Sequence, residues 1–225
     1  MAAGFFITGT DTGVGKTLVA CALLHAFRVR GKSAVGMKPV GAGREHGRCQ
    51  DAEALARAST LRAPEELANP YAFELPIAPH IAAELDEVEI SIDKIAAAHA
   101  KLARVADVVI VEGAGGFMIP LNPRQTSADL ARLLALPVIL VVGMRLGCLN
   151  HALLTRRAIE AIGVPCAGWV ANCIVPEMPY LERNIRTLEQ RLDCPYLGTI
   201  PHHAGIAPQD AAALIALPTL AASHA

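Results

Sequence analysis

The sequence lacks several features that would place it in a broad functional class. None of its six cysteines forms a Cys-x-x-Cys pair, so we expect reduced, mostly buried thiols rather than disulfides or a zinc site. The longest apolar runs, 108–111 and 138–142, are far too short to cross a bilayer. A net charge of −1 gives no reason to expect nucleic acid or an anionic membrane as a partner.

Signals of targeting and of multiple domains are also missing. The N-terminus shows no basic region followed by a long apolar segment, so we expect no secretory signal and a cytoplasmic protein. There is no internal repeat, low-complexity segment or linker. The 225 residues, 53% of them apolar, exclude disorder and suffice for one large α/β domain spanning 1–225.

A glycine-rich segment, Gly-Thr-Asp-Thr-Gly-Val-Gly-Lys-Thr, occupies residues 9–17. It follows the short apolar run 5–7 and leads into the apolar run 18–24, which reads as a buried helix. Strand, glycine-rich turn and helix form the context of a phosphate-binding P-loop. Exposed backbone N–H groups and the helix dipole would bind a polyphosphate there. The segment therefore predicts a nucleoside triphosphate site.

Within this segment, two side chains have predicted roles. Lys16 would reach the β- and γ-phosphates, and the hydroxyl of Thr17 would hold Mg²⁺. The strict pattern places glycine six residues before the lysine, but Thr10 stands there and the glycine is one residue earlier, at Gly9. The alternative is a glycine-rich turn that caps an ordinary helix, and the position of Gly-Lys-Thr at the strand-to-helix junction argues against it.

Strands and helices alternate along the rest of the chain. The clearest strand is 108–111, where four β-branched residues without polar alternation indicate cover on both faces, as in a parallel sheet. Further strands are expected at 33–37, 137–143, 167–172 and 197–201, and helices at 52–58, 91–103, 128–135, 150–162, 180–192 and from 209. Segments 41–50 and 69–79 read as loops. The pattern predicts a doubly wound, mainly parallel sheet with helices on both faces.

Three polar residues directly follow predicted strands: Lys38, Glu112 and Asn172. In an open parallel sheet, ligands bind beyond the carboxyl ends of the strands, so these side chains should converge on the triphosphate. Glu112 resembles the acid of a Walker B element and would bind Mg²⁺. The alternatives are a capping or surface carboxylate for Glu112, a solvated lysine for Lys38, and a strand-end backbone partner for Asn172.

Other polar residues are weaker candidates. Asp51 precedes an alanine-rich helix, where capping is about twice as common as metal binding. The histidines at 151, 202 and 203 lack metal-ligand spacing to a second cluster. Trp169 is expected in the core.

Several motifs in fixed order resemble the ATP-dependent dethiobiotin synthetases. Besides 9–17, they are Lys-Pro-Val at 38–40, Val-Glu-Gly-Ala-Gly-Gly at 111–116, Leu-Gly-Cys-Leu-Asn-His-Ala at 146–152 and Gly-Trp-Val-Ala-Asn at 168–172, with 69–71 and 141–143 between them. The resemblance runs from residue 4 to about 203 and includes the placement of Gly9. It implies a ligase of biotin synthesis that joins 7,8-diaminononanoate and CO₂ with ATP, through a carbamate and a carbamic–phosphoric anhydride, and that releases ADP and phosphate.

The resemblance also implies site residues. Lys16 and Lys38 would be catalytic, and Thr17, Asp51 and Glu112 would arrange Mg²⁺. The nucleotide would contact Gly13, Val14, Gly15, Lys16, Thr17, Leu18, Asp51, Glu112, Gly113, Ala114, Gly115, Asn172, Cys173, Pro201, His202 and His203. The diamine would contact Thr12, Lys38 and Ala42, and its carboxylate would lie at a helix N-terminus of the other subunit of a homodimer, formed by Gly147, Cys148, Leu149 and Asn150.

Two positions depart from the pattern of the family. Some members have a hydroxyl side chain where this chain has Ala42, and some have an acidic residue in place of Gly13.

Three other functions are alternatives. A cobyrinate-type amide-forming ligase would need a glutaminase domain, for which the chain has no room. A partitioning or switch ATPase would carry a signature lysine where Asp11 stands. A plain nucleotide-binding module would leave Lys38 and residues 147–150 without roles.

Overall fold

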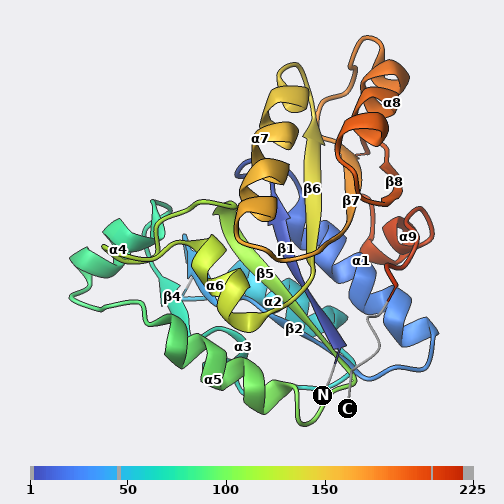
Figure 1. Cartoon of the computed structure of the whole chain (residues 1–225). Coiled ribbons are helices and arrows are strands. Elements are labelled where there is room, and N and C mark those ends of the chain that lie inside the picture. Colours follow the sequence, from blue (N-terminus) through green and yellow to red (C-terminus); the bar gives the residue numbers. More distant parts are fainter. Residues whose placement is uncertain (1–2, 45–46, 204, 220–225) are drawn as a thin grey trace.

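The computed structural model describes residues 3–44, 47–203 and 205–219. Its centre is a six-stranded, wholly parallel sheet in the order β2-β5-β1-β6-β7-β8 (Figure 1). The strands of the chain are β1 (Ala3–Gly9), β2 (Ala34–Met37), β3 (Val40–Ala42), β4 (Tyr71–Phe73), β5 (Val108–Gly116), β6 (Val138–Met144), β7 (Cys166–Cys173) and β8 (Tyr196–Ile200). The predicted doubly wound sheet is confirmed.

Helices cover both faces of this sheet. They are α1 (Lys16–Val29), α2 (Gln50–Ala58), α3 (Glu65–Ala68), α4 (Pro79–Leu85), α5 (Ile92–Leu102), α6 (Ser127–Leu134), α7 (Cys148–Ala161), α8 (Leu181–Arg191) and α9 (Pro208–Ala212). No helix of the described part is both long and apolar enough to span a bilayer.

Alternate residues of each central strand point to opposite faces and build separate parts of the core. In β1, Phe6 packs with α5 and α6, whereas Phe5 and Ile7 pack with α1, α2 and α9. In β7, Trp169 is fully buried beneath α7 and α8, as expected from the sequence. Because both faces are covered, these strands carry almost continuous apolar runs.

The two segments predicted as loops contain regular structure, and that prediction was wrong. β3 extends into segment 41–50 and pairs in parallel with β4, which lies in segment 69–79. Each strand has only three residues, too few to show a period of two. The helices α3 and α4, of four and seven residues, were missed because each has at most two turns, too few to show a helical period. Residues 45 and 46 of the first segment lie outside the described part.

Helix boundaries follow local capping. The hydroxyl of Ser91 accepts a hydrogen bond from the backbone N–H of Lys94 at 3.2 Å, which confirms Ser91 as the N-cap of α5. Asp51 is not an N-cap, since α2 begins at Gln50 after Cys49. Its carboxylate is therefore available for contacts elsewhere.

Candidate functional site

The chain between β1 and α1 forms a tight loop at the carboxyl edge of the sheet. Gly13 and Gly15 adopt positive φ values of 73° and 89°, which glycine tolerates without strain. Gly9 has a packing reason: a Cβ there would lie 2.5 Å from Cγ2 of Val14, a side chain that is 1% exposed. The hydroxyl of Thr10 accepts a hydrogen bond from the N–H of Gly143 at 3.3 Å. The departure from the strict motif thus serves the packing of Val14 and the contact with β6.

Lys16 is the first residue of α1 and is only 6% exposed. Its ammonium donates a hydrogen bond to the backbone carbonyl of Asp11 at 3.1 Å, so the side chain folds back across the loop. Burial, with the nearby Lys38 second, lowers the pKa of Lys16 to about 8. A buried cation with so few partners is suited to an incoming polyanion.

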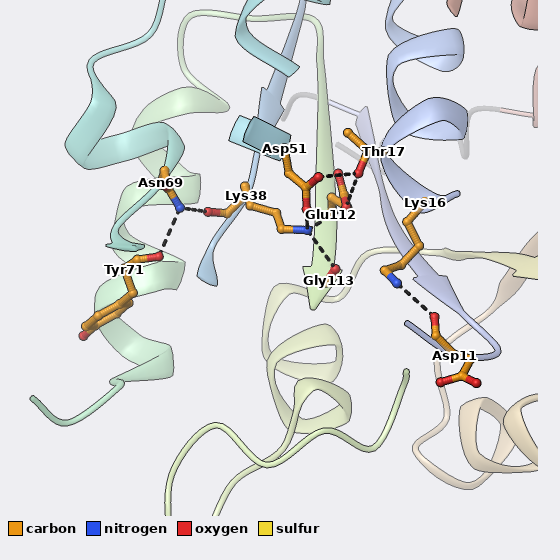
Figure 2. A network of polar contacts seen from close by, with 9 residues as sticks. All are labelled: Asp11, Lys16, Thr17, Lys38, Asp51, Asn69, Tyr71, Glu112 and Gly113. Atoms are coloured by element: carbon orange, nitrogen blue, oxygen red, sulfur yellow. Dashed lines mark hydrogen bonds and ion pairs between the residues drawn. The ribbon is translucent and has the colours of Figure 1, made fainter. Parts of the chain in front are cut away.

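Four side chains, from α1, the connection between β2 and β3, α2 and β5, meet beside the loop, as Figure 2 shows. The ammonium of Lys38 lies 2.7 Å from Oδ2 of Asp51 and 2.6 Å from Oε1 of Glu112. Oγ1 of Thr17 lies 2.9 Å from Oδ1 of Asp51 and 2.9 Å from Oε1 of Glu112. The carbonyl of Gly113 lies 3.5 Å from the same ammonium. The structure therefore brings together Lys38 and Glu112, which the sequence had placed at one edge, Thr17 of the P-loop, and Asp51, which only the family resemblance had assigned to this site.

Burial and mutual attraction set the charges of this cluster. Burial would lower the pKa of Lys38, but Glu112 and Asp51 raise it well above its ordinary value. Burial opposes ionisation of Asp51, yet Lys38 and Thr17 hold its pKa below the usual range. For Glu112, which is 1% exposed, burial raises the pKa although Lys38 opposes the rise. The alternatives of a solvated Lys38 and a surface Glu112 were wrong.

The cluster fits a divalent cation in the presence of a polyphosphate. Oε2 of Glu112 is buried and has no hydrogen-bond partner in the part of the chain that the structure describes. Two carboxylates and one hydroxyl are the hard oxygen ligands that Mg²⁺ takes alongside phosphate oxygens and water. The described residues hold no group of three or more His, Cys, Asp or Glu side chains arranged for a metal.

A cavity of about 710 Å³ lies over the loop and the cluster. The predicted residues Thr12, Gly13, Gly15, Lys16, Thr17, Lys38, Ala42, Asp51, Glu112, Ala114 and Gly115 line it. The rest of its lining, here called the apolar wall, was missed from the sequence: Val40, Pro76, Ile77, Ala78, Pro79, Ile119 and Pro120. The only sequence signal for this wall was the proline-rich composition of 69–79, which carries no periodicity. The cavity thus joins a polar floor, with two lysines and two carboxylates, to a wall that suits methylene groups.

Next to the loop, Asn172 at the end of β7 is 6% exposed, and its Nδ2 donates to the carbonyl of Val14 at 2.8 Å. The hydrogen bond goes to a backbone group, as in the alternative interpretation, but this group belongs to the P-loop and not to the end of a strand. The neighbouring thiol of Cys173 makes a backbone hydrogen bond with His202, while burial raises its pKa. Pro201, His202 and His203 follow β8 and are exposed. These residues form a second polar region beside the loop.

Residues 147–150 lie at the start of α7. Gly147 is the N-cap with φ 93°, and Gly147 and Asn150 are exposed. Leu149 is half-buried, whereas the side chain of Cys148 is 2% exposed and packs in the core between α7 and α8. Cys148 can therefore offer a ligand only its backbone. None of these four residues lines the cavity within its own subunit.

Comparison with known proteins agrees with this geometry. A family model described as an AAA domain matches residues 3–210. An ATP-dependent dethiobiotin synthetase of Nitrosospira multiformis is 55% identical over 215 residues, which cover 96% of this chain and 95% of the relative. The synthetase of Aromatoleum aromaticum is 53% identical over 95% of this chain and 97% of its own length. This chain belongs to the ATP-dependent dethiobiotin synthetase family. The predicted family and the predicted class, a ligase, are confirmed.

Solved structures show that the synthetase family shares its fold with more distant proteins. The septum site-determining protein MinD of Pyrococcus horikoshii matches 89% of this chain and 82% of its own with a TM-score of 0.54 and 16% identity. The cell division protein FtsY of Thermotoga maritima matches 93% of this chain and 64% of its own with a TM-score of 0.54 and 19% identity. At such identities the likeness concerns the fold alone.

Proposed function

We propose that this protein forms dethiobiotin from 7,8-diaminononanoate, CO₂ and ATP, the penultimate step of biotin synthesis. The observation that carries the proposal is the position of Lys38. A buried, charged lysine lines the same cavity as the P-loop Lys16 and the apolar wall. A simple nucleotide switch needs Lys16 and Thr17, but it has no use for this second cation or for the wall.

The proposed reaction has three steps. One amine of the diamine adds to CO₂ and loses a proton, which gives a carbamate. A carbamate oxygen then attacks the γ-phosphorus of ATP, so that ADP leaves and a carbamic–phosphoric anhydride forms. The second amine attacks the carbonyl carbon, the ureido ring closes, and phosphate leaves. The substrate supplies every nucleophile, so the protein must position two anions and neutralise their charge.

Each residue of the cluster has a task in this scheme. Lys38 stays protonated because its pKa is raised, and it would hold the carbamate against the γ-phosphate. Lys16 would neutralise the transferred phosphoryl group, and the backbone N–H groups of the loop would bind the β-phosphate. Thr17, Asp51 and Glu112 would hold Mg²⁺, which when bound neutralises negative charge on the phosphate oxygens. Val40, Ile77 and Ile119 would pack on the methylene chain.

The remaining contacts are also part of the proposal. The free groups of Asn172, with Pro201, His202 and His203, would bind the adenine. Residues Gly147, Cys148, Leu149 and Asn150 would bind the substrate carboxylate of the partner's site through the N-terminal end of α7, which favours an anion. This arrangement requires a homodimer of single-domain subunits, and we propose that it acts in the cytoplasm.

The test is phosphate release from ATP and Mg²⁺, with and without the diamine and bicarbonate, together with mass detection of the product. We expect release to require both compounds and the product to equal the diamine plus CO₂ minus water. The Lys38→Ala protein, verified as folded by circular dichroism, should release little phosphate. Release that is indifferent to the diamine would refute the synthetase and would favour a switch ATPase instead.

A further inference from the structure

Two thiols lie in contact at the end of the sheet opposite the proposed active site. The Sγ atoms of Cys166 and Cys194 are 3.1 Å apart, although the residues are 28 positions apart in the sequence. Cys166 begins β7, and Cys194 lies just before β8, the neighbouring strand (Figure 1). Oxidation to a disulfide would need the sulfurs to approach by only about 1 Å, to a bond length of ~2.05 Å.

The backbone holds both thiols in place. The carbonyl of Pro165, before Cys166, accepts a hydrogen bond from the N–H of Val138 at 2.8 Å. The carbonyl of Pro195, after Cys194, accepts one from the N–H of Trp169 at 2.9 Å. Each cysteine is thus tied through its neighbour to the parallel ladder. The short distance between the sulfurs follows from strand pairing rather than from two mobile loops.

The two thiols are accessible to a small oxidant, and one of them ionises more readily than an ordinary cysteine. Both cysteines are half-buried, and their neighbours Pro165, Asp193 and Pro195 are exposed, so a small oxidant can reach the sulfurs. The hydrogen bond with Cys194 lowers the pKa of Cys166, and Arg156 adds to this effect. The thiolate therefore forms more readily at Cys166, which is the requirement for attack on an oxidant.

We propose that Cys166 and Cys194 form a reversible disulfide when the protein meets a peroxide. The Cys166 thiolate attacks one oxygen of hydrogen peroxide, so that the O–O bond breaks and a sulfenic acid and hydroxide form. The thiol of Cys194 then attacks the sulfenic sulfur, the S–S bond forms, and water leaves. In total two thiols lose two electrons and two protons, and the peroxide becomes two waters.

The disulfide links the starts of β7 and β8 and leaves their far ends unchanged. Asn172 and His202 lie at those far ends, where the P-loop and the proposed base region are. The bond closes a long loop of the unfolded chain, so its expected effect is a more heat-stable protein. Because this disulfide lies away from the cavity, the rate of phosphate release by the oxidised protein should remain within about twofold of the rate of the reduced protein.

The experiment treats the purified full chain with hydrogen peroxide, blocks the remaining thiols with iodoacetamide under denaturing conditions, and analyses intact and digested protein by mass spectrometry. We expect a Cys166–Cys194 peptide and two thiols fewer available for alkylation, both reversed by dithiothreitol. The melting temperature of the oxidised protein should rise by about 5–10 °C.

Variants separate the pair from the other thiols. Cys166→Ser and Cys194→Ser should each abolish both the linked peptide and the thermal shift, whereas Cys173→Ser should retain them. The proposal is overturned if peroxide gives only sulfenic or sulfinic acid, if the linked peptide joins other cysteines, or if the shift persists in Cys166→Ser. None of these readouts depends on the reaction that the enzyme catalyses.

Discussion

The substitution Lys38→Met removes the cation that holds two carboxylates together in the candidate site. Methionine has a similar length and no charge, so it preserves packing while it leaves Glu112 buried without its partner. Glu112 is 1% exposed as a side chain, whereas Asp51 is 44% exposed. The ion pair of Lys38 with the half-exposed Asp51 is screened by water and contributes less than about 1 kcal/mol to stability. Nearly all of the expected loss of stability therefore comes from Glu112.

The loss of stability in Lys38→Met has an upper limit, because Glu112 can take up a proton instead of remaining charged. Protonation at pH 7 of a carboxyl group whose unfolded pKa is ~4.3 costs about 4 kcal/mol. Burial already raises the pKa of Glu112, and the loss of Lys38 removes the main effect that opposes this rise. We therefore expect the variant to be about 3–4 kcal/mol less stable than the wild type at pH 7, within the range found for broken buried pairs.

The pH dependence gives the sharper test. With Lys38 gone, the folded variant keeps the proton of Glu112 to a higher pH than the unfolded chain does. The folded state then binds more protons than the unfolded state, so stability falls as the pH rises. The penalty should be about 1 kcal/mol at pH 5 and should grow by about 1.4 kcal/mol per pH unit up to pH 7.

The assay is urea unfolding at pH 5, 6 and 7 in the presence of EDTA, so that no metal occupies the carboxylates. Lys101→Met, at an exposed position of α5, is the control and should change stability by less than about 0.5 kcal/mol. The double variant Lys38→Met/Glu112→Gln should recover most of the loss, because both charges are gone. A penalty that is independent of pH, or a double variant as unstable as the single one, would refute the reasoning.

Three further predictions concern the P-loop. In nucleotide-free protein, Lys16→Met should raise stability by about 2–3 kcal/mol at pH 7. Because the folded pKa of Lys16 is about 8 and the ordinary value is 10.5, urea unfolding should show this gain fading as the pH rises across that window. Asn172→Asp removes the donor to the carbonyl of Val14 and should weaken ATP binding at least ~10-fold in calorimetry, since the P-loop loses the hydrogen bond that holds it in place. Gly15→Ala should abolish ATP binding in the same assay, because alanine is strained at φ 89° and its Cβ would collide with the amide of Asn172.

The sequence was sufficient for the sheet and for the polar floor of the cavity. Long apolar runs such as Val138–Met144 identify buried parallel strands, and the polar residue after each strand must lie at the carboxyl edge. Lys38 and Glu112 of the cavity were found in this way, and so was Asn172, which lies beside the loop. Asp51 was harder to assign, because an acidic residue at the start of a helix has a common structural explanation. Only the fold shows that Cys49, not Asp51, precedes the helix.

The apolar wall of the cavity could not be predicted, for a physical reason. β3 and β4 have three residues each, and they exist because they pair with one another across about thirty residues of chain. Such pairing is a tertiary contact, which local propensity does not encode in so short a segment. Ile77 and Ile119 reach the cavity from loops whose positions depend on that pairing and on β5. The part of the site that would select a substrate is thus the part that the sequence reveals least.

Stability alone does not account for the charged cluster at this edge of the sheet. A lysine and a glutamate that are almost fully buried add little to stability compared with well-packed apolar side chains, because their desolvation offsets their attraction. Their retention is reasonable where an anion and a metal ion must later share the same oxygens and ammonium groups. Gly9 and Gly15 follow the same principle, since each allows a neighbour, Val14 or Asn172, to lie where a side chain would otherwise intrude. The residues that weaken local structure are those on which the proposed binding of ATP depends, and the surrounding parallel strands supply the stability that they do not.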